Sequence, residues 1–172
     1  GYDVFQEEER FLSGRAFESD GVPRGSAFPI DSFNSDIHLP RAQVSAFAED
    51  QFVVAWQDYD GYELRIVGRT FDEAGISTSG EFAVSQNPED SNRYPDVAGS
   101  GDEFVVVWTK LGSPATRVFG RRSGAGGVPI GDEFQVSATS AGDQLHSSVA
   151  ASPTGGFVIT WLALSSEDPS WG

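Results

Sequence analysis

Residues 104–108, FVVVW, form a continuous run of aromatic and β-branched side chains. A run of this kind, bounded by turn residues, predicts a short strand that is buried on both faces. Two similar runs occur in the chain, FVVAW at 52–56 and FVITW at 157–161, and their closing tryptophans are 52 and 53 residues apart. The chain therefore contains a repeat of about 52 residues, and each copy is expected to be one structural unit.

Two further sequence motifs recur with nearly the same period, and their successive copies are 54 and 52 residues apart. They are a Gly-Arg pair at 14–15, 68–69 and 120–121, and a short segment at 28–31 (FPID), 82–85 (FAVS) and 134–137 (FQVS). Both marks are typical of strands, and no segment has apolar residues at helical spacing. We therefore predict about four short antiparallel strands in each repeat.

The repeats are expected to form a single all-β domain of three four-stranded units. Their approximate bounds are 27–71, 81–122, and 133–163 together with 4–17. The pattern starts with a fourth strand and stops after a third strand, so we expect the N-terminal strand to complete the last unit. Closure of that kind hides the edges of radially arranged sheets.

The order of these marks resembles the blades of β-propeller repeats in large secreted and cell-surface bacterial proteins. The resemblance covers residues 11–161, and it implies a propeller-like fold without implying an activity. Propellers usually have about four to eight blades, whereas this chain has three repeats. Three explanations stay open: a longer array, two copies in a six-bladed ring, or another closure. A β-trefoil and a β-sandwich are the alternative folds.

Composition and charge exclude several classes of function. The 172 residues carry a formal net charge of −15, which disfavours binding to nucleic-acid phosphates. The chain contains no cysteine, so disulfides, thiolate metal sites and cysteine nucleophiles are excluded. No apolar run approaches the roughly 20 residues that a membrane-spanning helix needs.

The recurring tryptophans and arginines are the candidate ligand-binding residues. Trp56, Trp108 and Trp161 would form a platform for sugar rings, although packing anchors in each unit would recur in the same way. The arginines of the Gly-Arg pairs would bind carboxylates or sulfates around an axis, or would pair with acidic side chains of the protein itself. These arginines are Arg15, Arg69 and Arg121.

One turn contains the candidate metal ligands. Asp58, Asp60 and Glu63 surround Gly61, and Ca²⁺ prefers carboxylate oxygens on such turns. The longer D-x-D-x-D-G pattern is missing, and the other two repeats lack the three acidic residues. A solvated acidic hairpin is the alternative, and no other cofactor is expected.

We expect no catalytic site and therefore no enzyme activity. Only His38 and His146 could act as imidazole bases, and neither lies in a G-x-S-x-G or H-E-x-x-H frame. They occupy similar places in the loop before the second strand, where the second repeat has Arg93 or Tyr94. This placement is typical of a variable surface loop.

The sequence favours an interaction module that binds a protein partner, as an accessory or scaffolding subunit, through the loops at 31–40, 85–94 and 137–147. A lectin-like glycan-binding protein and a fragment of a sialidase-like glycoside hydrolase are the alternatives. Lys110 is the one lysine, and small polar residues are abundant. Together with the resemblance, this composition favours an extracytoplasmic location: periplasmic, secreted or cell-surface.

Overall fold

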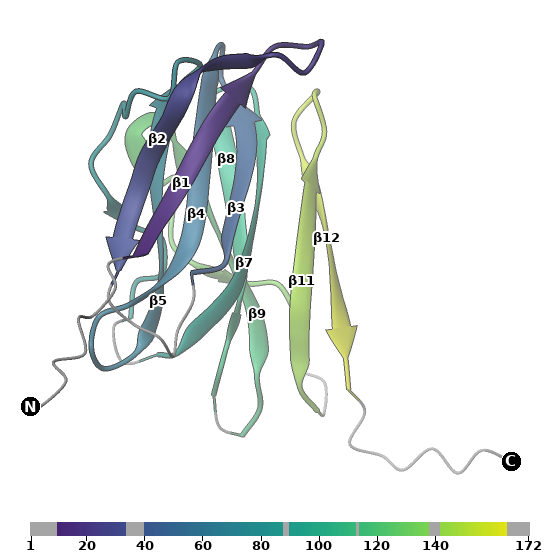
Figure 1. Cartoon of the computed structure of the whole chain (residues 1–172). Coiled ribbons are helices and arrows are strands. Elements are labelled where there is room, and N and C mark those ends of the chain that lie inside the picture. Colours follow the sequence, from purple (N-terminus) through teal and green to yellow (C-terminus); the bar gives the residue numbers. More distant parts are fainter. Residues whose placement is uncertain (1–9, 34–39, 88–89, 113, 138–141, 165–172) are drawn as a thin grey trace, which may run out of the picture.

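The computed structural model shows an all-β protein built from antiparallel sheets (Figure 1). The structure describes residues 10–33, 40–87, 90–112, 114–137 and 142–164. The strands are β1 (Arg10–Phe17), β2 (Pro23–Phe33), β3 (Ala42–Phe47), β4 (Gln51–Tyr59), β5 (Leu64–Asp72), β6 (Phe82–Ala83), β7 (Asn92–Ser100), β8 (Glu103–Lys110), β9 (Arg117–Gly124), β10 (Phe134–Gln135), β11 (Gln144–Ala151) and β12 (Phe157–Ala163). A single 3-10 turn, η1 (Ala125–Gly127), precedes β10.

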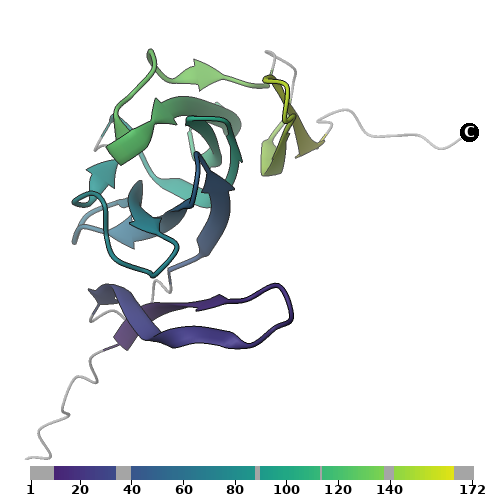
Figure 2. The same ribbon diagram turned by 90° about the horizontal axis from the view of Figure 1, so that it is seen from above.

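Two of the sheets have four strands, as the repeat predicts. The first complete sheet has the order β3-β4-β5-β6 and the second has the order β7-β8-β9-β10, so each follows the chain as an antiparallel meander. The remaining strands form two hairpins, β1–β2 and β11–β12. Figure 2 shows these hairpins on different sides of the two complete sheets.

The grouping of strands differs from the expected units by one strand. The short strand of each repeat pairs with the fourth strand of the repeat before it: β6 pairs with β5 and β10 with β9. The complete sheets therefore span 42–83 and 92–135 rather than 27–71 and 81–122. The period of a repeat fixes its length but not its phase, so the repeat alone does not decide which neighbouring strand the short strand joins.

The expected closure by the N-terminal strand is wrong for this chain. β1 pairs with β2, and β11 pairs with β12, while no hydrogen bonds join the two hairpins within the described ranges. The two complete sheets come between the hairpins in the stacking order, and β1 and β12 lie well apart (Figures 1 and 2). The described residues also form no closed barrel.

Apolar side chains pack between neighbouring sheets in three clusters. One cluster joins the β1–β2 hairpin to the first complete sheet and includes Ile30 and Trp56. The largest joins the two complete sheets and includes Phe104 and Trp108. The third joins the second complete sheet to the β11–β12 hairpin and includes Ile159. The four sheets therefore stack face to face in chain order, which buries the central strands β4 and β8 on both faces.

Candidate functional site

Three side chains from neighbouring sheets form a row where the strands β3, β7 and β11 begin. The guanidinium carbon of Arg41 lies 4.8 Å from the centre of the Tyr94 ring, which is a cation–π distance. The Tyr94 and His146 rings follow, with their centroids 5.3 Å apart. Arg41 and His146 are exposed and Tyr94 is half-buried. We call these three residues the Arg-Tyr-His row.

The row results from bulges at equivalent positions of two strands. The β7–β8 register shifts between Arg93 and Asp96, and the β11–β12 register shifts between Leu145 and Ser148. Tyr94 and His146 lie in these bulges, and a bulge re-aims the side chain that it carries. This local irregularity turns both rings toward the same end of the sheets.

Both bulged residues have strained backbones. The φ angles of Tyr94 and His146 are 56° and 55°, in the left-handed region that favours glycine. Such strain costs about 1–3 kcal/mol per residue and tends to persist at functional sites. The Oδ2 atom of Asp96 holds the bulge of β11 against β7, since it accepts hydrogen bonds from Ser148 Oγ and the Val149 amide, each at 2.8 Å.

The row borders a shallow cavity of about 290 Å³. The polar side chains that line it are Arg41, Gln43, Tyr94, Asp96, His146, Ser147 and Ser148. The cavity thus presents a guanidinium, an imidazole, an amide, hydroxyl groups and one carboxylate, whose Oδ2 atom already accepts two hydrogen bonds. These groups can bind a carboxylate or a hydrogen-bonding side chain of another molecule.

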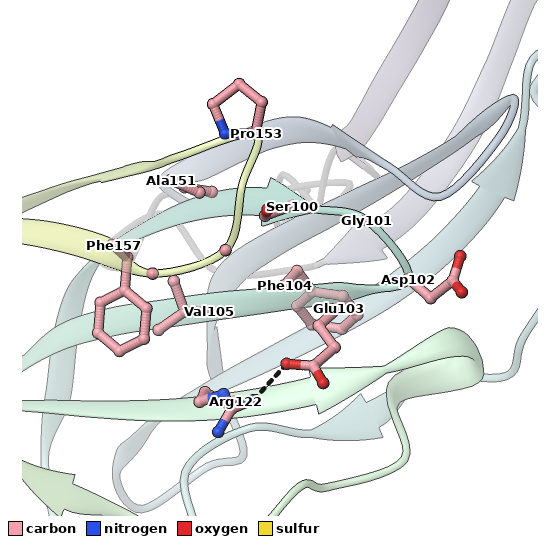
Figure 3. A pocket seen from close by; sticks show the side chains of 13 residues that line it. Ser100, Gly101, Asp102, Glu103, Phe104, Val105, Arg122, Ala151, Pro153 and Phe157 are labelled. Atoms are coloured by element: carbon pink, nitrogen blue, oxygen red, sulfur yellow. Dashed lines mark hydrogen bonds and ion pairs between the residues drawn. The ribbon is translucent and has the colours of Figure 1, made fainter.

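A larger cavity of about 630 Å³ lies between the second complete sheet and the turn that joins β11 to β12 (Figure 3). Its charged residues are Asp102, Glu103 and Arg122, and the Glu103 carboxylate forms an ion pair with Arg122. Phe104, Val105 and Phe157 supply apolar walls. Glu103 is therefore paired with a cation inside the cavity, and Asp102 is the second acidic residue of its lining.

Two of the three tryptophans cannot contact a sugar. Trp56 and Trp108 are 0% exposed, and their indole N–H groups donate to Asp31 Oδ2 (3.1 Å) and Asn92 Oδ1 (2.9 Å). The expected platform is therefore wrong for these residues, which are packing anchors. Trp161 is 40% exposed because no strand pairs with the free edge of β12 among the described residues.

Two of the recurring arginines connect neighbouring sheets. Arg69 donates to the Ile30 carbonyl at 2.6 Å and Arg121 donates to the Val84 carbonyl at 3.1 Å. In each pair the acceptor belongs to the preceding sheet. Arg15 instead donates to the Gly25 carbonyl of its own hairpin. The acceptors of these hydrogen bonds are backbone carbonyls, whereas the sequence indicates acidic side chains or a ligand.

Two of the three candidate calcium ligands have partners within the protein. Asp58 pairs with Arg65, at 2.6 Å, and the Oδ1 atom of Asp60 accepts hydrogen bonds from the backbone amides of Tyr62 and Glu63, at 3.0 Å each. The amides of Glu63 and Tyr62 hold the pKa of Asp60 below its ordinary value. Within the ranges that the structure describes, no three acidic or histidine side chains are grouped to hold a metal ion.

Sequence reasoning found His146 but assigned no role to Arg41 or Tyr94. The repeat places Tyr94 and His146 at equivalent positions, and this equivalence is the signal that points to the row. His38 and much of its loop at 31–40 lie outside the described residues, as do residues 88–89 and 138–141 of the other two loops.

No protein-family model, curated protein or solved structure matches this chain. No helix in the described part of the chain is long and apolar enough to cross a membrane.

Proposed function

We propose that this protein is a non-catalytic, extracytoplasmic interaction module that binds a protein partner through the Arg-Tyr-His row. The observation that carries the proposal is the pair of strained bulges that align Tyr94 and His146 beside Arg41. Glycine at either bulge would remove the strain, so the presence of larger side chains at these two positions supports a role in recognition.

The arrangement of the row favours a protein ligand over a sugar. Tyr94 already contacts Arg41 and His146, from the sheets before and after its own, so its ring is not an open stacking surface. The exposed groups are cationic or hydrogen-bonding, and they suit acidic side chains of a partner. The three loops that the sequence identified lead directly into the strands that carry the row.

Site-specific photocrosslinking in the organism that produces the protein tests this proposal. A photoreactive amino acid at Gln43, which lines the cavity, should capture one defined protein. The same group at Glu49, in the turn at the other end of β3, is the control and should not capture it. Arg41→Ala should reduce the yield of the adduct at least several-fold. Equal capture from both positions would contradict the proposal.

His146→Gly separates recognition from folding. Because His146 is exposed and has a positive φ, glycine should raise the free energy of unfolding by about 1 kcal/mol while it removes the imidazole. Loss of the adduct from this more stable variant would assign binding to the His146 side chain.

A glycan array tests the lectin-like alternative. A glycan signal that depends on His146 would favour that alternative over a protein partner.

A further inference from the structure

The free edge of β12 exposes side chains that are buried at the same place in the other repeats. Val53 in β4 and Val105 in β8 are 0% and 3% exposed, because the strand paired with their second edge, β5 or β9, and the following sheet cover them. The equivalent Val158 in β12 is 68% exposed. An open, apolar strand edge readily pairs with another strand.

The missing half of this sheet has the same sequence pattern as the β1–β2 hairpin. β11 and β12 correspond to the first two strands of each complete sheet, β7–β8 for example. β1 and β2 correspond to the last two, because they carry the Gly14-Arg15 pair and Phe28 at the places of Gly120-Arg121 and Phe134. Each hairpin therefore supplies what the other lacks.

The contacts between neighbouring sheets show the same complementarity. Gly75, with φ of 80°, lies against the ring of Phe28 in the preceding sheet, and Gly127, with φ of 76°, lies against Phe82 in the same way. The third glycine of this set is Gly21 of the β1–β2 hairpin, and none of the described residues lies within 4 Å of where its Cβ would be.

A surface for Gly21 exists on the second complete sheet. Phe134 in that sheet occupies the repeat position of Phe28 and Phe82. Its ring lies beside the Phe157 ring, with 6.1 Å between the two centroids. The arginine contacts extend the same series: Arg69 and Arg121 reach Ile30 and Val84, so Arg15 would reach the carbonyl of Val136.

We propose that two copies of this chain exchange hairpins, so that β1–β2 of each copy completes the sheet begun by β11–β12 of the other. The product is a closed ring of six four-stranded sheets, a number within the usual range for such rings. Two copies of the 172 residues would supply four complete sheets and four hairpins, and the exchanged hairpins would pair into two further sheets. The inference is independent of the proposed protein partner.

The repeat also fixes the register of the new strand pair. The pairs Val107↔Gly120 and Trp108↔Phe119 of the second complete sheet correspond to Thr160↔Gly14 and Trp161↔Ser13 across the two copies. The same register places Ala163 opposite Phe11, which is 59% exposed in the single chain. Opposed residues of antiparallel strands are close enough for a disulfide.

Disulfide trapping tests the proposal in a chain that has no cysteine of its own. Phe11→Cys and Ala163→Cys chains, mixed and oxidised, should form a covalent dimer in high yield. Phe11→Cys mixed with Val44→Cys is the control and should not, since Val44 is exposed but lies on β3. The unmodified chain should have twice its mass of 18.4 kDa in analytical ultracentrifugation.

Other outcomes would overturn the proposal. The chain carrying both Phe11→Cys and Ala163→Cys would give an intramolecular bond and a monomer mass if its own hairpins met. A monomer at every concentration, with no disulfide in the mixture, would show that the edge stays open. Val158→Lys should shift the protein to monomers while its strand content, by circular dichroism, is retained; an unchanged dimer would also contradict the model.

Discussion

The glycine of each Gly-Arg pair lies under a phenylalanine ring from the paired strand. A Cβ on Gly68 would be 2.7 Å from the Phe82 ring, and a Cβ on Gly120 would be 2.8 Å from the Phe134 ring. In the two complete sheets the neighbouring arginine, Arg69 or Arg121, donates a hydrogen bond to a carbonyl of the preceding sheet. In these two sheets a single dipeptide thus holds the last strand in place and connects the sheet to the one before it.

Gly68→Ala should destabilise the fold by about 1–3 kcal/mol, because the added methyl group forces Phe82 out of its place. Gly80→Ala is the matched control, since the structure leaves open space at Gly80 and it should change stability by less than about 1 kcal/mol. Urea unfolding of the two variants and the parent chain measures both effects. Equal free energies of unfolding for the two variants would show that the Phe82 ring moves aside without loss of stability.

The turn around Asp60 should make stability depend on pH. Its pKa is lowered in the folded protein by the amides of Glu63 and Tyr62, so its stabilising effect is present above the unfolded pKa of about 3.9 and is lost as pH falls through the folded value. Asp60→Asn should therefore be less stable than the parent at pH 6 and should approach it at pH values well below that unfolded pKa. Asp102→Asn, in another turn, makes the same change in net charge and is the control. A stability difference between Asp60→Asn and the parent that does not change with pH would contradict this account.

At the scale of elements, the central strands β4 and β8 define the core. Their FVVxW segments have a paired strand on each edge and a packed sheet on each face, and Trp56 and Trp108 are 0% exposed. The indole N–H groups bond to Asp31 and Asn92. β12 has the same pattern but one free edge, so burial here depends on the neighbours of a strand more than on its own residues.

Asp96 should control how firmly the β11–β12 hairpin is attached. Asp96→Ala removes the acceptor for Ser148 and for the Val149 amide, and should loosen the hairpin by about 1–3 kcal/mol. Hydrogen exchange of the β11 amides should become faster, while that of the β4 amides should not change. Asp96→Asn retains one acceptor oxygen and should have a smaller effect; uniform acceleration across all sheets would indicate global destabilisation instead.

At the scale of the whole molecule, the net charge of −15 opposes both folding and the proposed association of two copies. Added NaCl shortens the Debye length to about 8 Å near 0.15 M and screens this repulsion. Thermal unfolding should therefore move to higher temperature with salt, and the proposed dimer should bind more tightly. Near the pI of about 4.2 the salt effect should vanish, and a salt-induced loss of stability at pH 7 would contradict the prediction.

Much of the architecture follows from the sequence alone. The FVVxW runs, the Gly-Arg pairs and their period predict an all-β chain of antiparallel strands in four-stranded units, because side-chain alternation and turn residues are local signals. The structure confirms the all-β architecture with antiparallel strands, and it contains two of the three expected four-stranded sheets. The recurrence of Trp56 and Trp108 also indicates packing anchors, which is the role that the structure gives them.

Only the tertiary structure decided which strands pair and which side chains meet. A repeat has no intrinsic starting point, so the sequence could not place β6 with β5 or show that β1 and β12 lie apart. The Arg-Tyr-His row depends on bulges, and one extra residue in a strand changes the direction of a side chain without altering the pattern of residue types. Pairing and register are non-local, whereas the strand signals that the sequence carries are local.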